Sequence, residues 1–142
     1  MMNTQHIVST VIALGLSSLV VQAQADVVVV VGARSAVGNL TKTQISDLYM
    51  GRSKDFPNGD VALTTMISNS PSKDEFLLKV LGKTDSQARS VWARLTFTGA
   101  GSGPRELSDA NEFKKLAASN PNVIGFIDKS ALDAQVKVVF DP

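Results

Sequence analysis

The sequence predicts one α/β domain in three layers, with helices on both faces of a mixed β-sheet. Two observations favour this class. Short β-branched stretches alternate along the chain with stretches that carry apolar residues at helical spacing. The first predicted strand, Val27–Val31, is apolar at every position. A strand of that kind is buried on both faces, which requires helices above and below the sheet.

The first 25 residues differ in composition from the rest. They carry no Asp, Glu, Lys or Arg, and 14 of them are apolar. They end in Ala23-Gln24-Ala25, the small-x-small pattern that signal peptidase recognises. We therefore expect residues 1–25 to be a signal peptide and residues 26–142 to be a single exported, periplasmic domain. The alternative is that Ile7–Val21 forms a buried helix or strand of the domain.

The elements after Val31 follow from caps and apolar spacing. A helix is predicted over residues 40–51, because Thr41 and Gln44 have the spacing of a capping box. A turn at Pro57-Asn58-Gly59 precedes a strand over Val61–Ile67. A helix is predicted over 71–82, with Ser70 as N-cap and Ser72–Glu75 as an alternative capping box. The next helix begins at Thr84 and buries Ala88, Val91, Trp92 and Leu95. A further helix capped by Ser108 and strands over 123–127 and 136–140 complete the domain.

Composition excludes several classes of function. The 14 basic and 13 acidic residues give a net charge of +1, which lacks the excess of basic residues typical of nucleic-acid-binding domains. The only histidine is His6, and the chain has no cysteine. Residues 26–142 therefore cannot build a His/Cys metal site, a thiol nucleophile or a histidine base. We expect no enzyme activity, no metal and no cofactor. Val27–Val31 is also far shorter than the roughly 20 apolar residues that span a bilayer.

Two segments are candidates for anion binding. Ser68–Lys73 follows a predicted strand and enters a helix, so helix amides and serine hydroxyls can converge on an anion. The competing interpretation is that Ser70 and Ser72 only cap that helix. Ser70-x-x-Lys73 also has the spacing of serine β-lactamases, but the chain lacks their other motifs and is too short for their fold.

The second candidate is the glycine-rich loop Gly99–Gly103, whose backbone amides can surround a phosphate. It matches neither the P-loop nor the dinucleotide-binding motif, and a plain turn is the competing interpretation. Arg105 and Arg34 are cations that can neutralise an anion, or simple surface charges. Trp92 and Tyr49 occupy helical positions that favour the core over a ligand platform.

Three stretches together resemble a known family. Leu40–Arg52 resembles a helix ending in an "(I/L)(F/Y)xG" signature, Val61–Phe76 a strand followed by a serine-rich turn, and Asn120–Ile127 a "PGxIGYV" element. In this order they resemble the phosphate-specific periplasmic substrate-binding proteins of ABC transporters. The resemblance covers nearly all of residues 26–142 and is greatest to short members in which one lobe stands alone.

The resemblance implies a type 2 periplasmic-binding-protein-like fold, in which two lobes clamp an anion. Removing 25 of 142 residues leaves 117, which is enough for one lobe. The family's turn usually reads "RSDGSGT" and supplies Arg, Ser and Thr to phosphate. Here Ile67 stands near the arginine position, and Ser70-Pro71-Ser72-Lys73 replaces the glycine-rich core. The ligand residues we expect are Ser68, Asn69, Ser70, Ser72, Lys73, Gly99, Gly101 and Ser102.

These observations predict a periplasmic binding module that holds phosphate or a similar oxyanion weakly, because one lobe offers an open face. The alternative is a degenerate lobe without a transport role, acting as an interaction or sensory partner of a membrane transporter or sensor. Homo-oligomerisation through the open face is compatible with either.

Overall fold

The computed structural model describes Gly15, Ser17 and residues 26–142. The predicted signal peptide therefore lies outside the described residues, apart from Gly15 and Ser17. No helix in the described part of the chain has the length and apolar character needed to cross a bilayer.

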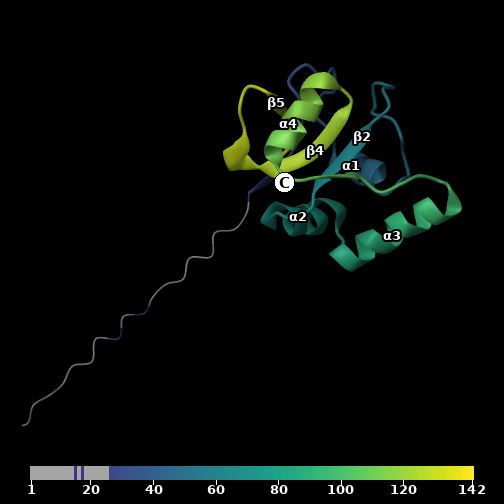
Figure 1. The fold of residues 1–142 in the computed structure, drawn as a ribbon, viewed down its shortest axis with the longest axis horizontal. Coiled ribbons are helices and arrows are strands. Elements are labelled where there is room, and N and C mark those ends of the chain that lie inside the picture. Colours follow the sequence, from purple (N-terminus) through teal and green to yellow (C-terminus); the bar gives the residue numbers. More distant parts are fainter. Residues whose placement is uncertain (1–14, 16, 18–25) are drawn as a thin grey trace, which may run out of the picture.

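The domain contains five strands and four α-helices in residues 26–142 (Figure 1). In chain order they are β1 (Val27–Gly32), α1 (Lys42–Tyr49), β2 (Leu63–Ile67), α2 (Pro71–Phe76), α3 (Asp85–Thr98), β3 (Arg105–Leu107), α4 (Ala110–Ser119), β4 (Val123–Asp128) and β5 (Val136–Phe140). A π-helical segment, Leu77–Leu81, extends α2, and a 3₁₀ turn, Lys129–Ala131, follows β4.

The strands form one mixed sheet in the order β3-β2-β4-β1-β5. β2 pairs in parallel with both β3 and β4, whereas β1 is antiparallel to β4 and β5. The three parallel strands define two ends of the sheet. We call the end where β2, β3 and β4 finish the carboxyl end, and the end where they begin the amino end.

Helices cover both faces of this sheet, as neighbouring residues of β4 demonstrate. Gly125 faces α4, because a Cβ built on it would lie 2.7 Å from the Phe113 ring. Phe126 faces the other way and stacks on Phe76 of α2, with ring centroids 4.4 Å apart. β1 runs between these layers, and all six of its residues are buried. The predicted three-layer α/β class with a mixed sheet is confirmed.

Most predicted boundaries and caps are confirmed. The capping boxes at Thr41 and Thr84 are both formed, and Ser70 caps α2 with Pro71 at its first position. Gly82 ends the extended α2 in a left-handed conformation with φ 64°. These ends agree with the sequence because each cap depends on residues within one turn of the helix.

Three details of the prediction were wrong. The chain after the glycine loop forms β3, for which the sequence predicts no strand, since only three residues pair there and two of them are exposed. Asp109, not Ser108, caps α4: its side chain accepts the Glu112 N–H. The second strand begins at Leu63, because Val61 is 64% exposed and forms only an isolated bridge with Asp55.

Candidate functional site

The serine turn, Ser68–Lys73, lies at the carboxyl end of the sheet, where β2 gives way to α2. The Ser68 N–H donates to the Leu107 carbonyl oxygen (3.3 Å), so the turn begins directly beside the end of β3. The Ser68 hydroxyl oxygen is buried and has no hydrogen-bond partner among the described residues. A buried hydroxyl without a partner is costly, and it is a site where a ligand or an ordered water restores a hydrogen bond.

The first amides of α2 are already engaged. Pro71 has no N–H, the Ser72 N–H donates to Ser70 Oγ (3.1 Å), and the Lys73 N–H donates to the Ser70 carbonyl oxygen (3.0 Å). The N–H groups of Asn69 and Ser70, in contrast, form no hydrogen bond within residues 26–142. The donors open to an anion are therefore those of the turn before the helix, together with the Ser68 hydroxyl.

The Lys73 ammonium already has a carboxylate partner. Its Nζ lies 2.8 Å from Asp85 Oδ1 at the start of α3, and only 8% of Lys73 is exposed. Asp85 also accepts the Arg89 guanidinium at 2.7 Å. Lys73 is a predicted anion ligand, but the structure shows a buried cation whose charge is compensated by Asp85 of a neighbouring helix.

The ion pair makes stability depend on pH. The Lys73 ammonium beside Asp85 holds the pKa of that carboxyl below its usual range. A carboxylate whose folded pKa is depressed stabilises the fold above its unfolded pKa of about 4, and this contribution is lost as pH falls through the folded pKa. We expect Asp85→Asn to cost no more than about 1 kcal/mol at pH 7, because the Asp85 side chain is 38% exposed and solvent screens the pair. Urea unfolding of both proteins should show this difference shrinking towards pH 2.5; a difference independent of pH would contradict the assignment.

The glycine loop lies at the opposite end of the sheet from the serine turn. It precedes β3, and the register pairs Thr65 with Arg105 in parallel, which places Gly103 beside Leu63. Ser68 is five residues further along β2, or about 16 Å at the rise of a strand. One small oxyanion cannot touch both segments. The expectation that Gly99, Gly101 and Ser102 assist the serine turn is corrected by this geometry.

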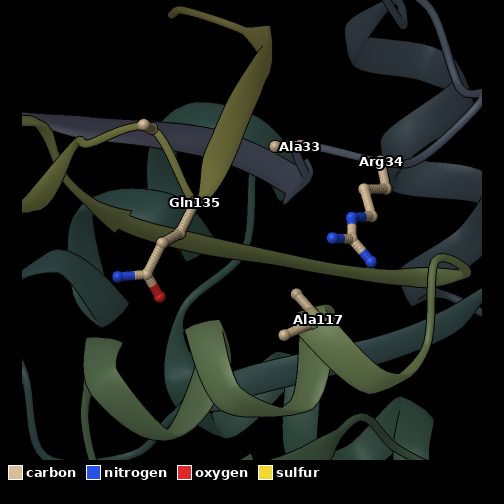
Figure 2. A pocket seen from close by; sticks show the side chains of 6 residues that line it. Ala33, Arg34, Ala117 and Gln135 are labelled. Carbon is tan, nitrogen blue, oxygen red and sulfur yellow. The ribbon is translucent and has the colours of Figure 1, made fainter.

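Arg34 and Arg105 also lie at the amino end. Arg34 follows β1, which runs antiparallel to β4 and therefore finishes where β4 begins. It lines a cavity of about 300 Å³ together with Gln135 and residues of α4. Figure 2 shows the Arg34 and Gln135 side chains on opposite sides of Ala117. Among the described residues, neither arginine forms a hydrogen bond or ion pair with the serine turn.

The two large amphipathic aromatics belong to the core, as predicted. Tyr49 is 1% exposed, and its hydroxyl donates to the Thr65 carbonyl oxygen at 2.7 Å. Burial raises the pKa of the Tyr49 phenol, so it stays neutral. Trp92 is 8% exposed and donates its indole N–H to the Tyr49 carbonyl oxygen at 2.8 Å. The first hydrogen bond fastens α1 to β2, the strand that leads into the serine turn, and the second fastens α3 to α1.

Asp85 is the residue that sequence reasoning missed. It stands directly after the Thr84 cap, and an acid in the first turn of a helix is fully explained by the helix dipole. Its pairing with Lys73 depends on how α2 and α3 fold back on one another, which no local pattern encodes.

Comparison with known proteins gives a consistent result at the level of structure. No family model matches the sequence, and no curated protein matches it significantly. Solved structures do match. A protein described as a phosphate ABC transporter substrate-binding protein from Clostridium perfringens, with bound phosphate, has a TM-score of 0.61 and 17% identity. An ABC-type phosphate transport receptor from Vibrio cholerae has a TM-score of 0.58 and 19% identity.

The fold is that of one lobe of a periplasmic binding protein. Each of these two alignments covers 81% of this chain but only 44% and 45% of the solved structures. The chain thus spans less than half the length of the proteins it matches. A third match, PstS from Borrelia burgdorferi, has a TM-score of 0.55 and covers 46% of that protein. The resemblance seen in the sequence is confirmed for the fold, and the length agrees with a single lobe.

Proposed function

We propose that this lobe is an exported oxyanion-binding module that takes phosphate or a similar anion at the serine turn. Residues 1–25 would act as the signal peptide, and residues 26–142 would work in the periplasm, without catalysis. The matching structures from Clostridium perfringens and Vibrio cholerae are described as a phosphate substrate-binding protein and a phosphate transport receptor, which supports this class of ligand.

The observation that carries the proposal is the Ser68 hydroxyl, which is buried without a hydrogen-bond partner at the carboxyl end of the sheet. Ligands of open α/β sheets bind outside the carboxyl ends of the parallel strands. The free N–H groups of Asn69 and Ser70 lie next to this hydroxyl in the turn. An anion at the turn would accept hydrogen bonds from all three groups, and the Ser72 hydroxyl can add a fourth.

The charge around the turn argues for weak binding. Asp85 neutralises Lys73, so an anion gains little from that cation unless the ion pair opens. A lysine also offers a point charge and not the two parallel hydrogen bonds of an arginine. A single lobe leaves the other side of the anion in water. A millimolar dissociation constant, equivalent to about 4 kcal/mol, is therefore the expected range.

A double variant tests the site. Ser70→Ala together with Lys73→Ala removes the cap that shapes the turn and the lysine that partly offsets the charge of Asp85 beside it, so we expect phosphate binding measured by calorimetry to disappear. Loss of an N-cap costs about 1 kcal/mol, so the melting temperature of the variant must be recorded to show that it remains folded. Phosphate affinity equal to that of the unmodified protein would place the site elsewhere.

A second function is favoured by the exposed apolar side chains. Phe97 is 93% exposed and Leu78 is 67% exposed. A lobe that contacts a membrane transporter or sensor would use such residues, and its serine turn would need no anion. No binding heat and no rise in melting temperature in millimolar phosphate would favour this alternative over the anion-binding module.

A further inference from the structure

A groove lies at the amino end of the sheet, away from the serine turn. It has a volume of about 380 Å³ and runs between the chain entering β2 and the glycine loop. One wall contains Lys54, Val61 and Thr64; the other contains Gly101, Ser102 and Arg105. One lining glycine on each side of the groove, Gly51 and Gly103, packs against α3.

Two glycines allow this close approach to α3. Gly51 has φ +74°, and a Cβ there would lie 2.7 Å from Leu95 Cδ1. Gly103 packs on Trp92, where a Cβ would lie 3.1 Å from the indole Cγ. Leu95 and Trp92 are one turn apart on the same helix, so both sides of the groove approach one face of α3.

The groove is positively charged. Lys54 and Arg105 are its only charged lining residues, and no carboxylate lines it. Neither cation forms an ion pair with any residue in the described range 26–142. This differs from the serine turn, where Asp85 compensates Lys73. Two uncompensated cations facing one cavity attract an anion with more than one oxygen.

The glycine loop adds neutral donors. The N–H groups of Ala100 and Gly101 are used, since both donate to the Leu95 carbonyl oxygen. Those of Ser102 and Gly103 form no hydrogen bond within residues 26–142. Successive free amides on a glycine-rich loop are suited to phosphate or carboxylate oxygens.

Size and lining indicate which anions fit. The volume of about 380 Å³ lies at the lower end of the range for small-molecule pockets, roughly 300–1,000 Å³. Part of the lining is apolar and comes from the side chains of Leu48, Val61, Ala62 and Leu63, whereas Ser53 and Thr64 add hydroxyl groups. A bare oxyanion would leave this apolar surface uncovered, whereas an organic group would cover it.

We propose that this groove binds a small organic phosphate, with its phosphoryl group between Lys54, Arg105 and the Ser102–Gly103 amides and its organic part against Val61 and Leu63. The site is independent of the serine turn. The glycine loop is too far from Ser68 to contact an anion at the serine turn, but it contributes amides to this groove.

The test is a titration of the ¹⁵N-labelled protein with phenyl phosphate, followed by NMR. We expect the amide signals of Ser102 and Gly103 to shift and to saturate by about 10 mM, where a site of millimolar affinity is mostly filled. Lys54→Gln with Arg105→Gln should weaken binding about tenfold or more. Ser102→Glu, which places a carboxylate in the groove, should abolish the shifts.

Matched control variants distinguish binding in the groove from a general effect of the protein's net charge. Arg94→Gln with Lys115→Gln removes two exposed cations outside the groove and should leave the affinity unchanged, as should Ser68→Ala. The proposal is overturned if the Ser102 and Gly103 signals do not move, if both double variants weaken binding equally, or if inorganic phosphate binds the groove as tightly as phenyl phosphate. Each result is read at the glycine loop, so it does not depend on whether phosphate binds the serine turn.

Discussion

Replacing Phe76 by alanine is expected to lower the free energy of unfolding by about 3–5 kcal/mol. Phe76 is fully buried, stacks on Phe126 with ring centroids 4.4 Å apart, and meets the edge of Tyr49 at 4.8 Å. The truncation would leave a cavity between α2 and the sheet, in the space where the Phe76 ring now packs against the rings of Tyr49 and Phe126. Urea denaturation followed by circular dichroism measures the change.

Phe97→Ala is the matched control, because it makes the same chemical change at a side chain that is 93% exposed. Its cost should lie within about 0.5 kcal/mol of zero. Equal costs for the two substitutions would show that the packing of α2 on β4 is wrong.

Gly125→Ala is expected to destabilise the fold by about 1–3 kcal/mol or more, although it adds only one methyl group. The new Cβ would lie 2.5 Å from Thr65 Oγ1 and 2.7 Å from Phe113 Cε2. The Thr65 hydroxyl is held by the Ile124 carbonyl oxygen at 2.9 Å, and the Phe113 ring is fully buried. Neither neighbour can move without breaking a contact of its own.

Gly38→Ala provides the comparison for that substitution. Its added Cβ would meet nothing within 4 Å, and its backbone conformation is open to any residue. We expect a change within about 0.5 kcal/mol, of either sign. A similar cost at both glycines would mean that α4 does not pack on β4 as described.

The fold class could be predicted because its evidence is local. The apolar run of β1, the capping boxes at Thr41 and Thr84, and the Ser70-Pro71 helix start each depend on a few adjacent residues. β3 could not be predicted in this way. Its three residues are ordered by pairing with β2, and exposed Arg105 and Glu106 carry no strand signal.

The site could be predicted only in part, because its parts are joined by topology. The serine turn was visible as a strand followed by a helix cap. The separation of the glycine loop from it depends on β2 and β3 running parallel, which puts the two loops at opposite ends of the sheet. The pairing of Lys73 with Asp85 also requires the relative placement of two helices. Gly125 is a position that the sequence identified without explaining. It corresponds to the second glycine of the "PGxIGYV" element, and the structure shows that the Phe113 ring leaves no room there for a side chain.

The most direct test of the account is an NMR titration of the purified protein with inorganic phosphate. The account predicts that the amide signals of Asn69, Ser70 and Ser72 shift together and saturate at millimolar phosphate, and that Ser68→Ala removes most of the effect. Signals at the serine turn that stay fixed up to about 10 mM phosphate, while the protein remains folded, would contradict the proposed anion site.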